Sequence, residues 1–201
     1  MTQGLSPQPV WYNAVLVGAA VTVAGAFVTG RYAAWQERKR KRKALLASYL
    51  GEVSVIRKGL RDYLKLVKPS IEEEEVPEIN ALLQPAMPKK VFEETVGTLG
   101  EFGDWKLAEQ ITALYARIER AEDRTRSLVA NPTPVAEEGR RGHFLEHVAL
   151  LGDATLTIYV IKELLVHDSR EQVTDLMQHG NPRDEEDKKD FKFAKDLEDL
   201  L

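Results

Sequence analysis

The chain opens with thirty residues that include no charged side chain, and basic residues begin directly after them. Within this stretch, residues 11–30 read WYNAVLVGAAVTVAGAFVTG. Twenty residues of helix rise about 30 Å, the hydrocarbon thickness of a bilayer, and a helix satisfies its own backbone groups in lipid. Trp11 and Tyr12 at one end, with Tyr32 and Trp35 at the other, are placed as interfacial aromatic residues are. The pattern predicts a transmembrane helix.

The distribution of basic residues predicts the orientation of that helix. No lysine or arginine precedes it, whereas seven lie between Arg31 and Lys43. Such residues stay on the cytoplasmic side, so we expect the N-terminus outside and the body inside the plasma (inner) membrane of a bacterium. A cleavable signal peptide is disfavoured, because its basic residues would precede the apolar stretch. A buried core helix is disfavoured, because an uncharged stretch of this length is rarely needed in a soluble domain.

The basic run next to the predicted span forms a collar suited to anionic lipid headgroups. Each lysine or arginine beside such a membrane gains about 1 kcal/mol. The residues expected to contact lipid are Arg38, Lys39, Arg40, Lys41, Arg42 and Lys43. Because the collar adjoins the span, we interpret it as a lipid contact rather than a nucleic-acid signal.

Small side chains recur every four residues within the predicted span. The set is Ala14, Gly18, Thr22, Ala26 and Gly30. Such a stripe lets two helices approach closely in lipid, which would support a homo-oligomer. Glycine and alanine are also common in any membrane helix, so both explanations stay open.

Beyond the collar the apolar spacing is helical. Positions from Leu45 to Val67 step by three and four, so the first helix should continue until Pro69. A proline-rich acidic loop follows, and a second helix is predicted over 90–100.

A third helix is predicted to begin with Asp104 as N-cap and to bury one stripe. The stripe consists of Leu107, Ile111, Leu114, Ile118, Ala121, Thr125 and Leu128. A fourth helix, from about Gly142 to Asp168, is apolar on much of its circumference, which predicts a central position. The expected fold class is all-α: one N-terminal transmembrane helix continuing into a cytosolic antiparallel bundle of about four helices.

The same patterns predict the organisation of the chain. We expect an extracytoplasmic N-terminus at 1–10, the span at 11–30, the collar at 31–43, the bundle at 44–179 and a charged tail at 180–201. Two states of the tail are open: a short peripheral helix, or a segment that is disordered until a partner binds. The side chains that would line such a helix are Phe193, Leu197, Leu200 and Leu201.

Charge and cysteine content narrow the function classes. The whole chain has 28 basic and 32 acidic residues, and residues 31–43 include seven of the basic residues and one glutamate. Residues 44–201 therefore have 21 basic and 31 acidic residues, a net charge of −10. An acidic body argues against nucleic acid as a partner, because phosphate binding needs positive charge on a folded face. The chain has no cysteine. Thiolate chemistry and cysteine-based metal sites are therefore excluded.

One motif has the spacing of a catalytic site. His143, Glu146 and His147 fit the His-x-x-Glu-His pattern, in which two histidines bind zinc and the glutamate serves as general base. A zinc site needs a third protein ligand, and His167 is about 36 Å away along the same helix. We therefore expect partly exposed histidines at a helix start, with no metal or other cofactor bound.

The segment from Val91 to Ile118 resembles uncharacterised bacterial single-pass membrane proteins. It reads VFEETVGTLG over 91–100 and LAEQI over 107–111, followed by Leu114-Tyr115. The resemblance implies an N-terminal anchor with a cytosolic helical bundle, and it implies no activity.

Three functions remain as hypotheses. The preferred one is a non-enzymatic, membrane-anchored interaction or scaffold protein with an unidentified protein partner. It is favoured because we find no glycine-rich phosphate loop and no nucleophile paired with a base. The alternatives are an oligomerising membrane effector of phage or defence type, and a zinc-dependent hydrolase that uses the histidine motif.

Overall fold

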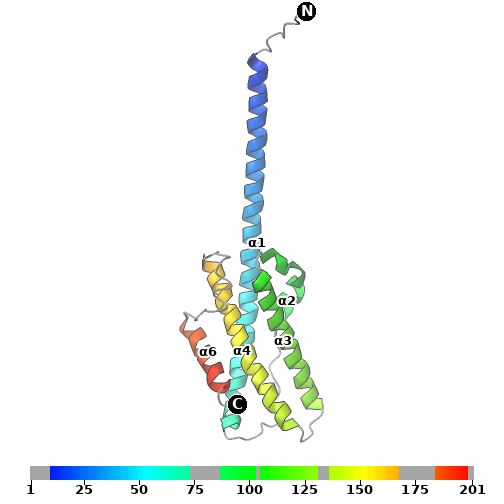
Figure 1. Ribbon diagram of the computed structural model, residues 1–201, viewed down its shortest axis with the longest axis vertical. Coiled ribbons are helices and arrows are strands. Elements are labelled where there is room, and N and C mark those ends of the chain that lie inside the picture. Colours follow the sequence, from blue (N-terminus) through cyan, green and yellow to red (C-terminus); the bar gives the residue numbers. More distant parts are fainter. Residues whose placement is uncertain (1–9, 73–86, 103–104, 131–135, 168–183, 199–201) are drawn as a thin grey trace, which may run out of the picture. The chain divides into compact units, whose positions relative to one another are not determined.

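The computed structural model describes residues 10–72, 87–102, 105–130, 136–167 and 184–198, which are helical apart from short flanking residues and include no strand (Figure 1). The helices are α1 (Val10–Glu72), α2 (Lys90–Thr95), the 3-10 helix η2 (Val96–Phe102), α3 (Trp105–Ala130), α4 (Ala136–His167) and α6 (Glu185–Glu198). This confirms the predicted all-α class. The chain divides into two compact units, Met1–Arg42 and Lys43–Leu201, and the boundary falls within α1.

In the first unit, α1 is exposed along its apolar segment. All side chains from Val17 to Trp35 are solvent-exposed, among them Val21 and Phe27. Among the described residues, α1 is the one helix long and apolar enough, by length and composition, to cross a membrane. Its most apolar segment of 18 residues has a mean hydropathy of 1.2, and none of that segment is buried.

The second unit is a bundle with one apolar core. α1 contributes a stripe that includes Tyr49, Val53 and Leu60, and α4 buries residues on much of its circumference, as expected for a central helix. The α3 stripe is confirmed: Leu107, Ile111, Leu114, Ile118, Ala121 and Thr125 are buried, and Leu128 packs against them partly exposed.

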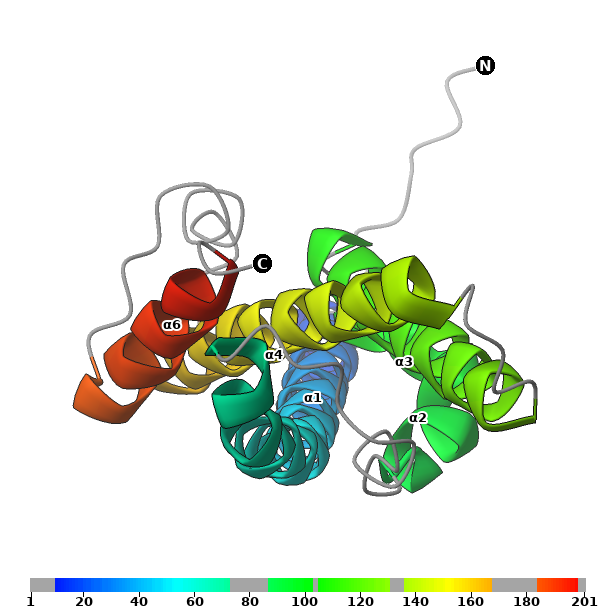
Figure 2. The same cartoon turned by 90° about the horizontal axis from the view of Figure 1, so that it is seen from below.

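The polar contacts give the directions of the helices. Arg117 pairs with Asp153, and Arg124 pairs with Glu146, so α3 and α4 are antiparallel. In both views α4 lies between α3 and α6 (Figures 1 and 2). The central position predicted for the fourth helix therefore agrees with the structure.

Several helix boundaries differ from the predictions. α1 ends at Glu72, beyond Pro69, and α4 begins at Ala136 rather than near Gly142. The helix predicted over 90–100 is α-helical only to Thr95 and continues as η2, where glycines and β-branched residues have low α-helix propensity. The predicted N-cap Asp104 and most of the acidic loop lie outside the described residues.

The charged C-terminal segment belongs to the bundle. α6 is a helix in the second compact unit, with Ala194 and Leu197 buried and Phe193 partly buried in the core. Leu200 and Leu201 lie outside the described residues. Of the two states left open for the tail, the structure shows the helix, and α6 packs on the bundle because one of its faces is complementary to α1 and α4.

Candidate functional site

The His-x-x-Glu-His motif lies on α4, where the two histidine rings are adjacent and the glutamate pairs with Arg124 of α3. His143 and His147 are fully buried, which corrects the expectation of partial exposure. The His143 Nε2 atom is 3.3 Å from the Tyr63 hydroxyl, and the His147 Nδ1 atom is 2.8 Å from the His143 carbonyl oxygen, to which it donates. The Glu146 carboxylate instead accepts a hydrogen bond from Arg124 at 3.1 Å. The glutamate is therefore paired with Arg124 of α3.

The histidines are part of an aromatic cluster between α1 and α4. The Tyr63 ring lies 5.2 Å from the ring of His147 and 6.4 Å from the ring of Phe144, centroid to centroid, and the two histidine rings are 4.3 Å apart. Burial lowers the pKa of His143 to about 3, and it also lowers the pKa of His147. Both imidazoles are therefore neutral packing groups near neutral pH. Among the described residues, no three His, Asp or Glu side chains are grouped to hold a metal ion.

Most, but not all, of the residues expected to contact lipid are exposed on the surface. Arg38, Arg40, Lys41 and Lys43 are exposed, and the Lys39 ammonium lies 5.4 Å from the Trp35 ring centroid. Arg42 is buried in the protein, which corrects its assignment to the lipid-contacting set.

The small-residue stripe is exposed where its side chains are described. Gly18, Thr22, Ala26 and Gly30 are all solvent-exposed, and nothing lies within 4 Å of a Cβ placed on either glycine. The Thr22 hydroxyl donates to the Gly18 carbonyl oxygen at 2.9 Å, so its polar group is satisfied within the helix. The side chain of Ala14 lies outside the described residues, and association through this stripe stays a prediction.

Two buried polar clusters were not predicted from the sequence. In the first, Glu52 on α1 accepts hydrogen bonds from the backbone N–H groups of Val91 at 2.7 Å and Phe92 at 3.2 Å, and from the Tyr115 hydroxyl. α2 begins after Lys89, which provides no side-chain cap, so Glu52 supplies the acceptor from another helix. Burial and the bond to Glu52 raise the pKa of Tyr115.

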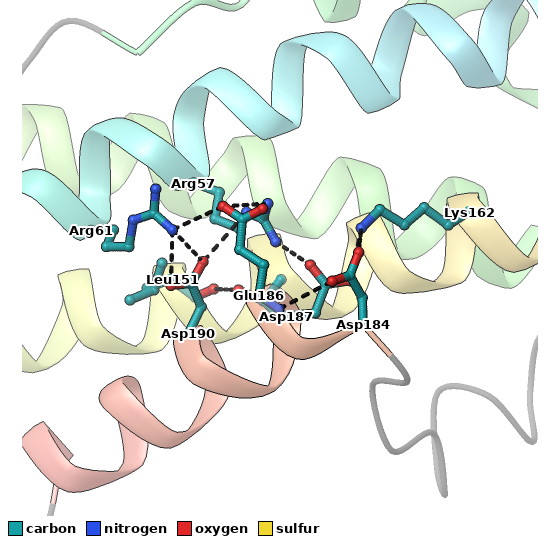
Figure 3. A network of polar contacts seen from close by, with 9 residues as sticks. Arg57, Arg61, Leu151, Lys162, Asp184, Glu186, Asp187 and Asp190 are labelled. Atoms are coloured by element: carbon teal, nitrogen blue, oxygen red, sulfur yellow. Dashed lines mark hydrogen bonds and ion pairs between the residues drawn. The ribbon is translucent and has the colours of Figure 1, made fainter.

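The second cluster joins α6 to α1 and α4 (Figure 3). The basic side chains come from the bundle: Arg57 and Arg61 of α1, and Lys162 of α4. We call these three residues the cationic face. The acidic side chains come from α6 and the residue before it: Asp184, Glu186, Asp187 and Asp190.

Asp187 is at the centre of this cluster and is fully buried. One of its carboxylate oxygens accepts from the Arg57 guanidinium, and the other lies 2.9 Å from the Lys162 ammonium. Asp190, also buried, lies 3.5 Å from Arg57 Nε and 3.3 Å from Arg61 Nη1. One α6 carboxylate thus connects α1 with α4, and the next one connects two arginines one helical turn apart.

The sequence contains a signal for both clusters. Counting back from Leu197, the positions 194, 190 and 187 continue a spacing of three and four, so the aspartates share the helix face of Ala194 and Leu197. Glu52 likewise lies between Tyr49 and Ile56 on the core face of α1. A charged residue at a core-facing position is the pattern to look for, because burial then requires a partner.

No protein family, curated protein or solved structure matches the chain. The functional assignment therefore rests on the contacts described above.

Proposed function

We propose that the chain is a membrane-anchored, non-enzymatic interaction protein. Residues 11–30 span the plasma membrane with the N-terminus outside, and the helical unit faces the cytoplasm, where it binds a protein partner. One observation carries the proposal: the described side chains of the span, from Val17 to Gly30, are uncharged and exposed. Exposed apolar surface of this extent is unfavourable in water and favourable in lipid.

The residues after the span support the same placement. Tyr32 and Trp35 have ring centroids 5.9 Å apart, and the Arg31 guanidinium lies 5.1 Å from the Phe27 ring centroid. Aromatic rings beside basic groups suit the interface between hydrocarbon and headgroups. The exposed collar residues then meet anionic headgroups on the cytoplasmic side.

The non-enzymatic assignment is supported by how the motif residues are used. His143 and His147 pack in the core with Tyr63, and Glu146 pairs with Arg124. A reaction at this position would need water and substrate to reach two histidine side chains that are fully buried.

The experiment is a topology test on the full chain. A reporter that is active only in the cytoplasm is fused after Leu201, and a second fusion carries a reporter that is active only outside the cytoplasm. We expect activity from the first fusion alone, and retention of the protein in membranes after an alkaline wash. Activity of the second fusion, or release by the wash, would contradict the proposal.

A further inference from the structure

α6 docks on the bundle through a face that is half ionic and half apolar. Its inward residues are Asp187, Asp190, Ala194 and Leu197, and only the last two are apolar. The first two meet the cationic face, as Figure 3 shows. The acidic half of α6 therefore selects its position on the bundle.

The ionic half gives specificity more than net affinity. Each buried ion pair gains Coulomb energy but loses the hydration of both ions, and the two terms largely offset each other. Removing one member is costly, because the other charge stays buried without a partner. Replacing the whole helix by another with the same carboxylates restores every contact. α6 is thus held by an arrangement that resists deletion of a charge but permits exchange of one acidic helix for another.

The cationic face also has binding capacity that α6 does not use. The Nε atom of Arg61 is buried and has no hydrogen-bond partner among the described residues. A competing helix with a carboxylate in reach of this atom would gain a charge-assisted hydrogen bond that α6 lacks. Residues 44–201 have the net charge of −10 given above even with the three cations of this face included, so an acidic helix is repelled from other surfaces and directed to this one.

We propose that the cationic face is the docking site for the cytoplasmic partner, that the partner presents an acidic amphipathic helix, and that α6 occupies the face until that helix displaces it. This inference rests on the proposed function and names the chemistry of its partner. The partner helix carries carboxylates three residues apart, followed by apolar residues on the same face, as α6 does.

A labelled synthetic peptide of residues 184–198 serves as the acidic-helix probe, and its binding to the full chain in detergent micelles is measured by fluorescence anisotropy. In the variant Asp187→Asn, Asp190→Asn the chain's own α6 no longer competes well, so we expect at least tenfold tighter peptide binding than to the wild-type chain. In the variant Arg57→Gln, Arg61→Gln the contact of the chain's own α6 with the bundle is also weakened, but two of the three cations of the cationic face are lost. We therefore expect the peptide to bind at least tenfold more weakly to this variant than to the aspartate variant.

The matched control is Glu185→Gln, which changes an exposed α6 residue that pairs with Lys188 of the same helix. It should bind the peptide as the wild type does. Equal binding to the aspartate and arginine variants would overturn the inference, and so would no gain in the aspartate variant.

A second measurement leaves the cationic face and the acidic residues of α6 unchanged, so it does not depend on the folding of those variants. Because the chain has no cysteine, single cysteines at the exposed positions Lys65 of α1 and Lys192 of α6 can carry spin labels. Excess unlabelled peptide should shift the distance distribution between the labels to longer values. An unchanged distribution at saturating peptide would overturn the inference. The topology fusions read out the proposed function separately, so if the chain is correctly inserted and the peptide fails to bind, only the docking inference falls.

Discussion

His143 and His147 lie one helical turn apart on α4, with both side chains buried against Tyr63. Burial lowers the pKa of His143 to about 3 and lowers that of His147, whereas an unfolded histidine titrates near 6.5. Below pH 6.5 the unfolded chain therefore binds more protons than the folded chain. The free energy of unfolding must fall as the pH decreases from about 6.5 towards 3.

The prediction concerns the slope of stability against pH. Each histidine contributes up to about 1.4 kcal/mol per pH unit in this window, and the variant His143→Gln, His147→Gln should lose that contribution. Urea unfolding of the wild type and the variant, followed by circular dichroism at pH 7.5, 6.5 and 5.5, measures the difference. Carboxylates such as Glu186 titrate in both proteins and cancel. Parallel slopes would mean that the imidazoles are hydrated in the folded chain.

At the residue scale, the sequence predicted the apolar positions well but not the buried polar ones. The α3 stripe from Leu107 to Thr125 follows from spacing alone, because apolar side chains need only to leave water. Whether Asp187 or Glu52 is buried depends on a partner more than thirty residues away, which no local pattern specifies. The histidines were misplaced for the same reason, since their neighbour Tyr63 comes from another helix.

At the scale of single elements, α3 shows how much one stripe contributes to the bundle. Ile111 is fully buried in the core, whereas Ala113 of the same helix is exposed. Ile111→Asp would bury an unpaired carboxylate and lose apolar contacts, so we expect a loss of several kcal/mol in the free energy of unfolding.

The matched variant Ala113→Asp places the same charge in solvent. It should lower stability by less than about 1 kcal/mol, mostly through the lower helix propensity of aspartate. Urea midpoints of both variants and the wild type, measured in the same detergent, give the comparison. If the two variants melt alike, the face of α3 that packs against α4 has been misassigned.

Element boundaries followed the sequence less closely than element identity. α2 and η2 together replace one predicted helix, because Gly97 and Gly100 weaken α-helix propensity within the segment. α6 was one of two open predictions, and its folding depended on the cationic face, which is assembled from α1 and α4. The periodicity of α6 indicates the helix and its inward face, but the partners that bury its aspartates come from other helices.

At the scale of the whole molecule, the proposed orientation follows from the asymmetry of charge about the span. The test variant has three lysines inserted before Trp11 and glutamine in place of Arg38, Lys39, Arg40, Lys41 and Lys43. Its membrane orientation should be inverted, because basic residues stay in the cytoplasm. Arg42 is kept, since it is buried.

The reporter after Leu201 measures the outcome. Activity should move from the cytoplasmic to the extracytoplasmic reporter, fully or in a mixed population. Insertion of three glutamines at the same place, with the collar intact, is the control and should leave the orientation unchanged. A chain that keeps its orientation after both changes would show that the folding of residues 43–201, rather than charge, decides the topology.

The dependence of α2 on Glu52 has a consequence for local opening. A helix of six residues is far too short to form alone. The amides of its second and third residues, which donate to Glu52, are therefore protected only while α1 and α3 are assembled around it. In hydrogen–deuterium exchange, Val91 and Phe92 should therefore exchange together with the amides of α1 near Glu52 rather than through fraying of α2 itself. The shortest helix would then report the opening of the whole bundle, because its cooperative unit is larger than its own length.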